Sequence, residues 1–322
     1  MTKVSSDKIQ MAVQAARLYY ECDENQQQIA KKLNISRPQV SRLLNLAREE
    51  GIVEIRINSP LETYSRLENI LCHHFGLKQV IVVPMSTTDS NLVKKNLARV
   101  TANFLDQIVE NGQIIGIPWG STLSYVAKYL KERETKDITI VQLKGGVGRI
   151  SGKVDTYHPV ITFAHKLKAT PCFLPAPSIV DNLQVKEILM SDAKINEILE
   201  LGIKADVAIY PIGIPVPDSV LVQAGYFTQE EMITLQEKGA VGDICSRYFL
   251  ANGEIVDQDL NDRTIGIELD KLQLKKYAIA VAGGKDHAPG ILGALRGKYL
   301  NTLITDEAAA LEVIKLAGIK SG

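Results

Sequence analysis

A lysine stands at the end of an apolar run and directly before two glycines, in Leu143-Lys144-Gly145-Gly146. An amine that is partly removed from water has a lowered pKa and is more often neutral. A neutral Lys144 amine can form a Schiff base with the aldehyde of an open-chain sugar. The milder alternative is that Lys144 stays charged and pairs with ligand oxygens or with a carboxylate. The sequence leaves both alternatives open.

A second segment, Gly116-Ile-Pro-Trp-Gly-Ser-Thr122, combines glycines, hydroxyl side chains and a predicted helix start. A helix start offers free N–H groups and the positive end of the helix dipole, and both favour an anion such as phosphate. The segment therefore predicts a phosphate site at Gly120, Ser121 and Thr122. The alternative is a structural turn in which Ser121 is only a helix cap.

Two further segments carry charged side chains next to glycine. Asp243 follows Gly242 and can accept hydrogen bonds from sugar hydroxyls, although Arg247 four residues later could instead be its structural partner. Lys285 follows Gly283-Gly284 at the end of another apolar run, where it looks like a second contact to phosphate. The alternative for Lys285 is an ordinary lysine in a surface loop.

The residues from Gln26 to Ala47 predict two short helices joined by a turn at Asn34-Ile35, with Asn25 and Ser36 as N-caps. No acidic residue occurs between Gln26 and Arg48, whereas five are basic, as a DNA-reading helix requires. The exposed side chains suit base edges and phosphates. The alternative is a plain helical hairpin. The residues expected to contact DNA are Gln26, Gln27, Ser36, Arg37, Pro38, Gln39, Ser41, Arg42 and Asn45.

Composition bounds these interpretations. The chain has 322 residues, no net charge and 45 % hydrophobic residues, which indicates a soluble protein of two or more domains. A net charge of zero argues against a protein that coats nucleic acid nonspecifically, but it allows a small DNA-reading domain within a neutral chain. We expect no signal peptide, no membrane span, no metal and no cofactor. The four cysteines form no Cys-x-x-Cys pair, which fits reduced thiols in the cytoplasm.

The predicted elements divide the chain into two parts. A helix over Lys8–Glu21, the two short helices and a strand over Ile52–Ile57 make a winged helix-turn-helix domain at residues 1–57. Pro60 marks the boundary, and an amphipathic helix over Leu61–Phe75 begins the second domain, residues 58–322. There, short apolar runs alternate with helices, which predicts a mostly parallel sheet covered on both faces.

Within this second domain three details are tested below. We expect one helix over Val185–Leu201, a strand near Cys172–Leu174, and a hairpin turn at Ala251–Gly253. Because ligands of open parallel sheets bind beyond the carboxyl ends of the strands, the segments around Ser121, Lys144, Asp243 and Lys285 are expected to share one site.

Several motifs together resemble the SorC family of bacterial sugar-responsive transcriptional regulators, over essentially the whole chain. They are Gln28-Ile-Ala, Ile35-Ser-Arg-Pro-Gln-Val-Ser-Arg-Leu-Leu44, Trp119-Gly-Ser-Thr, Gly242-Asp-Ile-Cys-Ser-Arg247 and Gly290-Ile-Leu-Gly-Ala-Leu295. The segment Gln142-Leu-Lys-Gly-Gly146 looks most like the branch that includes the deoxyribonucleoside regulator of Gram-positive bacteria. In that branch the lysine matching Lys144 can hold deoxyribose 5-phosphate covalently.

The resemblance implies a winged helix-turn-helix joined to a Rossmann-like, sugar-phosphate isomerase-like α/β domain. It also implies homodimers or homotetramers, operator DNA as a partner and release by a phosphorylated sugar, which suits a repressor. The effector contacts implied are Gly120, Ser121, Thr122, Lys144, Gly145, Gly146, Asp243 and Lys285. The alternative is an enzyme, a sugar-phosphate isomerase or deaminase with a DNA-binding head. We expect no enzyme, because no histidine or carboxylate pair accompanies Lys144 and Asp243 in these segments.

Overall fold

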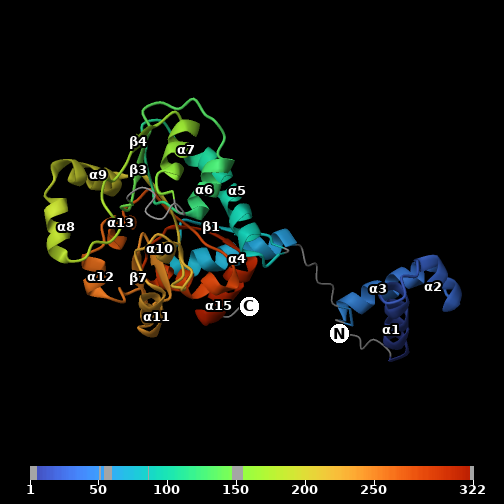
Figure 1. Ribbon diagram of the computed structural model, residues 1–322. Helices are drawn as coiled ribbons and strands as arrows, with labels where there is room; N and C mark the ends of the chain where they lie inside the picture. The colour runs from blue at the N-terminus through green and yellow to red at the C-terminus, as the bar shows by residue number, and fades with distance from the viewer. Residues whose placement is uncertain (1–5, 51, 54–59, 86, 147–154, 320–322) are drawn as a thin grey trace. The chain divides into compact units, whose positions relative to one another are not determined.

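A computed structural model of the chain describes residues 6–50, 52–53, 60–85, 87–146 and 155–319. The chain divides into two compact units, Met1–Ser59 and Pro60–Gly322, which are coloured dark blue and light blue to red in Figure 1. None of the described helices combines the length and the apolar composition that crossing a membrane would require.

The first unit contains three helices, α1 (Ser6–Tyr20), α2 (Gln26–Lys32) and α3 (Arg37–Glu49). Asn25 caps α2, because its side chain accepts from the backbone N–H of Gln28 and the Gln28 side chain accepts from the N–H of Asn25. Asn34 makes the tight turn in the left-handed conformation, with a φ of 51°. The three helices share a core of small and branched side chains: Ala12, Ala15, Ala16, Ile29, Val40, Leu43, Leu44 and Ala47.

The expected helix-turn-helix is therefore confirmed. The expected wing strand at Ile52–Ile57 cannot be compared in full, because residues 54–57 lie outside the described part of the chain. Ile52 and Val53 are described; they are not in a strand, and they pack against the three-helix core.

The second unit is built on a seven-stranded sheet in which every pairing is parallel, in the order β1-β9-β8-β5-β2-β3-β4. Two short antiparallel strands, β6 and β7, form a separate hairpin. The strand bounds are β1 Gln79–Val83, β2 Ile114–Ile117, β3 Thr139–Gln142, β4 Thr170–Cys172, β5 Val207–Pro211, β6 Gly242–Ile244, β7 Arg247–Phe249, β8 Tyr277–Val281 and β9 Thr302–Asp306.

Helices cover both faces of this sheet. The helix bounds are α4 Pro60–Phe75, α5 Ser90–Ile108, α6 Ser121–Tyr129, α7 His158–Lys166, α8 Leu183–Met190, α9 Ala193–Lys204, α10 Val220–Gln223, α11 Gln229–Glu237, α12 Gln258–Asp262, α13 Leu269–Leu272, η1 Lys285–His287, α14 Ala288–Arg296 and α15 Glu307–Leu316. Helices α5, α6 and α7 pack on one face, and α4, α14 and α15 pack on the other. Strand residues alternate between the two cores, as Val207 and Ile209 face the first and Ala208 and Tyr210 the second.

The predicted parallel sheet with two covered faces is confirmed, whereas one detail of the prediction is wrong and two are borne out only in part. The expected helix over Val185–Leu201 is two helices, because the Asp192 side chain accepts from the N–H groups of Lys194 and Ile195 and starts a new helix. The strand expected near Cys172–Leu174 lies two residues earlier, where Thr170–Cys172 pairs with β3.

The hairpin is also placed differently. The sequence predicted its turn at Ala251–Gly253, but the paired strands β6 and β7 meet at Cys245-Ser246, both with positive φ. Two central residues with positive φ make the tight turn that suits antiparallel strands, although Asn-Gly is the usual pair there. The predicted turn at Ala251–Gly253 is also present. The N–H of Leu250 donates to the Glu254 carbonyl at 2.8 Å, the N–H of Val256 donates to the Tyr248 carbonyl at 3.1 Å, and Phe249 forms an antiparallel bridge with Ile255.

The strand order fixes where a ligand can bind. From β2 the chain proceeds through β3 to β4 towards one edge, and from β5 it proceeds through β8 to β9 towards the other. The connections after β2 and β5 therefore leave neighbouring strands in opposite directions and open a crevice between them. In open parallel sheets ligands bind in this crevice, beyond the carboxyl ends of the strands.

Candidate functional site

The exposed surface of α3 carries the side chains expected to meet DNA. Arg37, Pro38, Gln39, Arg42 and Asn45 are exposed. Arg37 and Arg42 form no ion pair with any described residue, so their guanidinium groups are available for phosphates or guanine edges. Among the other expected contacts, Ser36 and Gln27 are exposed, and Ser41 and Gln26 are half-buried.

Three of the expected DNA contacts, Ser36, Gln39 and Asn45, form hydrogen bonds within the protein instead. Gln39 Oε1 accepts from the N–H of Ser36 at 2.8 Å and from Ser36 Oγ at 2.9 Å, so both side chains cap α3. Asn45 Oδ1 accepts from Arg48 Nη2 at 3.2 Å. A base contact by Gln39 or Asn45 would require these hydrogen bonds to be exchanged.

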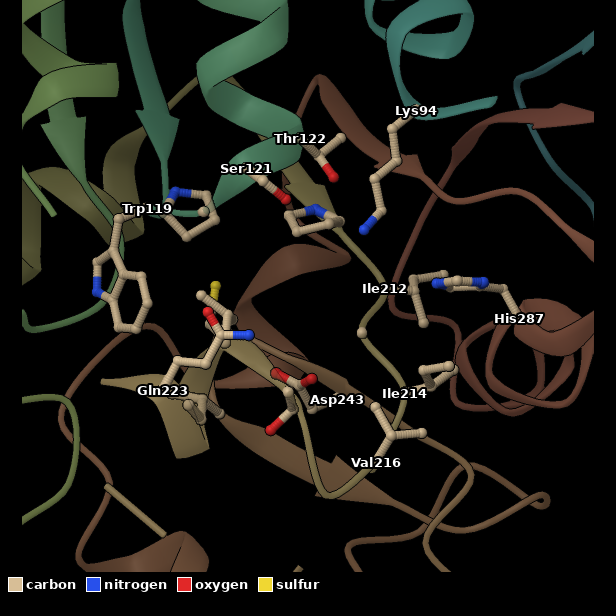
Figure 2. A pocket seen from close by; sticks show the side chains of 18 of the residues that line it. Lys94, Trp119, Ser121, Thr122, Ile212, Ile214, Val216, Gln223, Asp243 and His287 are labelled. Atoms are coloured by element: carbon tan, nitrogen blue, oxygen red, sulfur yellow. The ribbon is translucent and has the colours of Figure 1, made fainter. Parts of the chain in front are cut away.

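A cavity of about 450 Å³ lies in the crevice between β2 and β5 (Figure 2). Its lining comes from the segments that follow β2, β3 and β5, from the β6–β7 hairpin, and from α5 and η1. Five of the eight expected effector residues line it: Gly120, Ser121, Thr122, Lys144 and Asp243. The structure thus brings together residues that are up to 123 positions apart in the sequence, from Gly120 to Asp243.

Lys144 is buried at the end of β3, with only 4 % of its surface exposed. Its Nζ donates to Ser246 Oγ at 3.3 Å and lies 3.8 Å from the centre of the Trp119 ring, a cation–π contact. Burial lowers the pKa of Lys144, and the negative charge of Asp243 opposes this effect. Burial therefore favours the neutral form of the amine more than water would, whereas Asp243 favours the charged form.

Asp243 lies opposite Lys144 on the β6–β7 hairpin, and its carboxylate points into the cavity in Figure 2. Its Oδ2 accepts from the N–H of Ser246 at 3.2 Å, across the tight turn. Burial raises the pKa of Asp243, while Lys144 lowers it. The backbone of Gly213 passes so close that an added Cβ would lie 2.1 Å from Asp243 Oδ1, so only glycine leaves room for the carboxylate.

Arg247 is not the partner of Asp243, which decides between the two alternatives left open by the sequence. The Arg247 guanidinium is buried and donates to the carbonyls of Ile267 at 2.9 Å, Asn261 at 2.9 Å and Gly266 at 3.1 Å. It therefore fixes the chain at residues 261–267 under the cavity, and Asp243 is left to face the cavity and Lys144.

Gly120 gives α6 an open start. It adopts a φ of 143°, and Ser121 and Thr122 begin the helix immediately after it. The first N–H groups of a helix have no acceptor within the helix, so those of α6 are directed towards the end of the cavity where Ser121 and Thr122 lie. The geometry agrees with an anion-binding helix start.

Gly145, Gly146 and Lys285 do not line this cavity. Gly145 and Gly146 are structural: the Gly145 carbonyl accepts from Trp119 Nε1 at 2.7 Å, and a Cβ on Gly146 would lie 2.5 Å from that nitrogen. Lys285 lines a neighbouring hollow of about 730 Å³, is 68 % exposed, and pairs with Glu312 at 3.5 Å. Lys285 therefore lies beside the cavity that holds Lys144 rather than in its lining, and its contact to an effector stays a prediction.

Three lining residues were missed by the sequence analysis as ligand contacts. Trp119 belongs to a motif that was recognised but was not assigned to the ligand. Lys94 lies in α5, far from any glycine-rich segment, so the sequence gives no signal for it. His287 lies two residues after Lys285, in a segment from which only the lysine was expected to contact the ligand.

No cluster of histidine, cysteine or carboxylate side chains in the described parts of the chain could hold a metal ion. The cavity therefore offers an amine, a carboxylate and hydroxyl groups rather than metal ligands. This set can hold a polyhydroxylated molecule that carries an anionic group, and the amine can react with its aldehyde.

Comparisons with known proteins agree with both units. Residues 59–315 match the family described as "Putative sugar-binding domain", and residues 6–54 match the one described as "Homeodomain-like domain". The deoxyribonucleoside regulator of Bacillus subtilis is 42 % identical over 310 residues, which cover 96 % of this chain and 98 % of that protein. The sorbitol operon regulator of Klebsiella pneumoniae is 34 % identical over 319 residues, covering 97 % and 99 %.

Solved structures give the same result. The crystal structure of the full-length sorbitol operon regulator from Klebsiella pneumoniae superposes with a TM-score of 0.72 at 34 % identity, covering 95 % of this chain and 99 % of that one. A DeoR family transcriptional regulator from Listeria monocytogenes superposes with a TM-score of 0.71 at 27 % identity, covering 78 % and 99 %.

Proposed function

Because the chain belongs to the SorC family of sugar-binding transcriptional regulators, we propose that it is a repressor released from its operator by a phosphorylated sugar. The chain is a transcriptional regulator with a helix-turn-helix and a sugar-binding domain. The expectation that it is not an enzyme is confirmed by relatives that match nearly its whole length and are named regulators. The repressor role, the effector and the site residues are the proposal.

One observation carries the choice of effector. A buried amine, Lys144, is influenced by the charge of Asp243, and both residues line the same cavity as the start of α6. An open-chain aldose phosphate has an aldehyde at one end and a phosphate at the other, and hydroxyl groups between them. We therefore propose a phosphorylated pentose or deoxypentose, such as 2-deoxyribose 5-phosphate.

The chemistry of these groups allows a covalent complex between Lys144 and the sugar. The neutral Lys144 amine adds to the aldehyde carbon, and the resulting carbinolamine loses water to give a Schiff base. Loss of water needs a proton donor, and Asp243 suits this role because burial raises its pKa. The non-covalent form, in which charged Lys144 binds sugar oxygens, uses the same pocket.

DNA binding is proposed to use α3 in the major groove, with Arg37 and Arg42 as the principal contacts. A homodimer or homotetramer would present two such helices to the two half-sites of an operator. Such a protein acts on chromosomal DNA, so we propose that it works in the cytoplasm.

A thermal-shift screen tests the effector. Phosphorylated pentoses are expected to raise the melting temperature, because a ligand that binds only the folded state stabilises it. The unphosphorylated sugars are expected to do much less. Equal shifts from both forms would contradict the phosphate site at α6, and no shift from any sugar phosphate would contradict the proposed effector class.

A gel-shift assay with the DNA upstream of the chain's own gene tests the regulator. The protein is expected to prefer this DNA over random duplex in moderate salt, and the stabilising sugar phosphate is expected to weaken the complex. A complex that forms equally on random duplex would contradict sequence-specific binding.

A further inference from the structure

The tight turn at Cys245-Ser246 has an unusual backbone conformation. Both residues have positive φ, 54° at Cys245 and 69° at Ser246. In the part of the chain that the structure describes, no other two neighbouring residues share this conformation without a glycine. Positive φ costs free energy for a residue with a Cβ, so glycine or asparagine would fit such a turn more easily. A strained turn of this kind indicates that one of its side chains has a task at the site.

Ser246 contacts both of the charged groups of the cavity. Its backbone N–H donates to Asp243 Oδ2 at 3.2 Å, and its Oγ accepts from Lys144 Nζ at 3.3 Å. Within the described residues, Ser246 Oγ is the one hydrogen-bond acceptor for Nζ. Ser246 is itself completely buried and does not line the cavity. It can therefore act on a ligand only through Lys144 and Asp243.

The backbone on both sides of this contact is fixed by one short segment, residues 265–267. This segment forms backbone hydrogen bonds of 2.7 and 3.0 Å with the residues directly before and after Lys144. Arg247, the neighbour of Ser246, donates to two carbonyls of the same segment at 2.9 and 3.1 Å. The distance between Nζ and the hydroxyl is thus set by a rigid frame before any ligand binds.

A hydroxyl in this place suits an amine that must react. The charged form of Lys144 donates to Ser246 Oγ, and the neutral form can donate one N–H to the same oxygen while its lone pair stays free. The Trp119 ring limits the amine on another side, where Nζ lies 3.8 Å from the ring centre. An amine held in one orientation reacts faster with a bound aldehyde than one that rotates freely.

We propose that Ser246 is a positioning residue that holds the Lys144 amine and the Asp243 carboxylate for reaction with the effector's aldehyde, and that this task keeps a serine in the strained turn. The inference rests on the proposed function. In that reaction the lone pair of Nζ forms the C–N bond, and the aldehyde oxygen leaves as water. One proton of this water comes from the amine and the other from Asp243, which leaves a protonated imine beside the Asp243 carboxylate.

The rate of imine trapping across a range of pH tests this role. The full chain is mixed with 2-deoxyribose 5-phosphate and cyanoborohydride, and mass spectrometry measures the modified Lys144 peptide over time. Ser246→Ala removes the hydroxyl, and Ser246→Gly removes the hydroxyl and also relieves the strain of positive φ. The control is Thr101→Val, which removes a buried hydroxyl of α5 that donates to the Leu97 carbonyl at 2.8 Å and does not line the cavity.

Both Ser246 variants are expected to trap the sugar about tenfold more slowly at high pH, where the Lys144 amine is neutral in every variant. The pH of half-maximal rate is expected to fall as well, because the hydroxyl accepts from the ammonium form and its loss disfavours that form. Asp243 and Cys245, the ionisable groups that act on Lys144, are the same in each variant. Thr101→Val is expected to stay within about twofold at every pH.

Stability is expected to separate from reactivity. Ser246→Gly should melt no lower than Ser246→Ala, because glycine adopts positive φ without strain, yet both variants should lose the same reactivity. Ser246→Gly also replaces Ser246→Ala if the latter does not fold. The inference is overturned if either folded variant traps the sugar at the wild-type rate, or if Thr101→Val causes an equal loss.

A second measurement does not depend on the sugar. Competitive labelling with acetic anhydride across the same pH range follows the titration of the Lys144 amine in each variant. A wild-type protein that gives no sugar adduct contradicts the covalent form of the proposed function. In that case a lower labelling midpoint in Ser246→Ala still supports the contact between Ser246 and Lys144, and an unchanged midpoint overturns it.

Discussion

At the scale of single residues, the cavity depends on groups whose ordinary ionisation is disturbed by burial. Lys144 and Asp243 lie far apart in the sequence, but each is removed from water and each is the main opposite charge for the other. Cys245, which lines the same cavity, has its pKa raised by burial to about 12 and therefore remains a thiol at neutral pH. The amine is thus the nucleophile that this site offers.

Reductive trapping tests the reactivity of Lys144. With borohydride and 2-deoxyribose 5-phosphate, the peptide that contains Lys144 is expected to gain the mass of the reduced sugar phosphate, because reduction makes the Schiff base permanent. Mass spectrometry of the digested protein measures this. Lys144→Met is expected to abolish the adduct, and an unmodified Lys144 at saturating ligand would leave only the non-covalent form.

Replacement of Arg42 with Ala tests the DNA-reading helix. We expect operator binding to weaken by about 1–3 kcal/mol if Arg42 contacts a base, because a bidentate contact is lost. Gel-shift titrations measure the affinity, and the thermal shift with sugar phosphate is expected to stay unchanged. Arg99→Ala, an exposed arginine of α5 whose Nη2 donates to Asn96, is the control and is expected to bind the operator normally.

At the scale of elements, short connections rather than long helices shape the cavity. The turn at Cys245-Ser246 places Asp243 at the cavity, and Gly213 leaves space for its carboxylate.

A lysine also stabilises the end of a helix. Lys275 Nζ donates to the carbonyls of Gly202, at 2.9 Å, and Ile203, at the end of α9. Such contacts satisfy the free carbonyls of a helix end.

Lys275→Met is expected to lower the free energy of unfolding by about 1–3 kcal/mol, because two carbonyls at the end of α9 lose their buried donor. Lys276→Met is the control, since Lys276 forms an exposed pair with Glu110 at 2.9 Å, and exposed ion pairs contribute little to stability. Urea unfolding curves measure both variants. Equal effects of the two substitutions would contradict the role of Lys275.

Lys275 also predicts a pH dependence. Burial lowers the pKa of Lys275 to about 8, from an ordinary value of 10.5 that the unfolded chain retains. Between these two values the unfolded state binds more protons than the folded state, so the contribution of this residue to stability rises with pH. Unfolding free energies across this range are expected to rise less in Lys275→Met than in the wild type.

The sequence predicted the sheet well because strands buried on both faces are nearly continuous apolar runs. It predicted Ser121, Thr122, Lys144 and Asp243 because each lies beside glycine near the end of a strand. It failed at Lys94, which lies inside a helix with no local signal, and at the Cys245-Ser246 turn, whose residues are unusual for positive φ. It also placed Lys285 beside Lys144, whereas in the structure Lys285 lines the neighbouring hollow and pairs with Glu312.

At the scale of the whole molecule, the helix-turn-helix and the sugar-binding domain belong to separate compact units, Met1–Ser59 and Pro60–Gly322. Each unit has its own core, so each function can be changed without unfolding the other. Regulation therefore requires a free-energy coupling between the two ligands, and such a coupling is reciprocal by thermodynamic necessity.

Reciprocity gives a quantitative test. The sugar phosphate is expected to weaken operator binding by a factor of roughly 5–150, the range of typical coupling energies. Operator DNA is expected to weaken sugar-phosphate binding by the same factor. Gel-shift titrations at saturating sugar phosphate and calorimetry at saturating operator measure the two sides. If the sugar phosphate instead strengthens operator binding or changes the protein–operator complex without releasing the protein, the repressor role is contradicted.

Trp119 is the single tryptophan of the chain, and it lies between Lys144 and Tyr226 in the wall of the cavity. Fluorescence that is excited only in the indole ring therefore comes from this one place in the molecule. The intrinsic fluorescence of the native protein should change when Lys144 loses its charge or forms an imine, so occupancy can be followed by emission in real time without a dye.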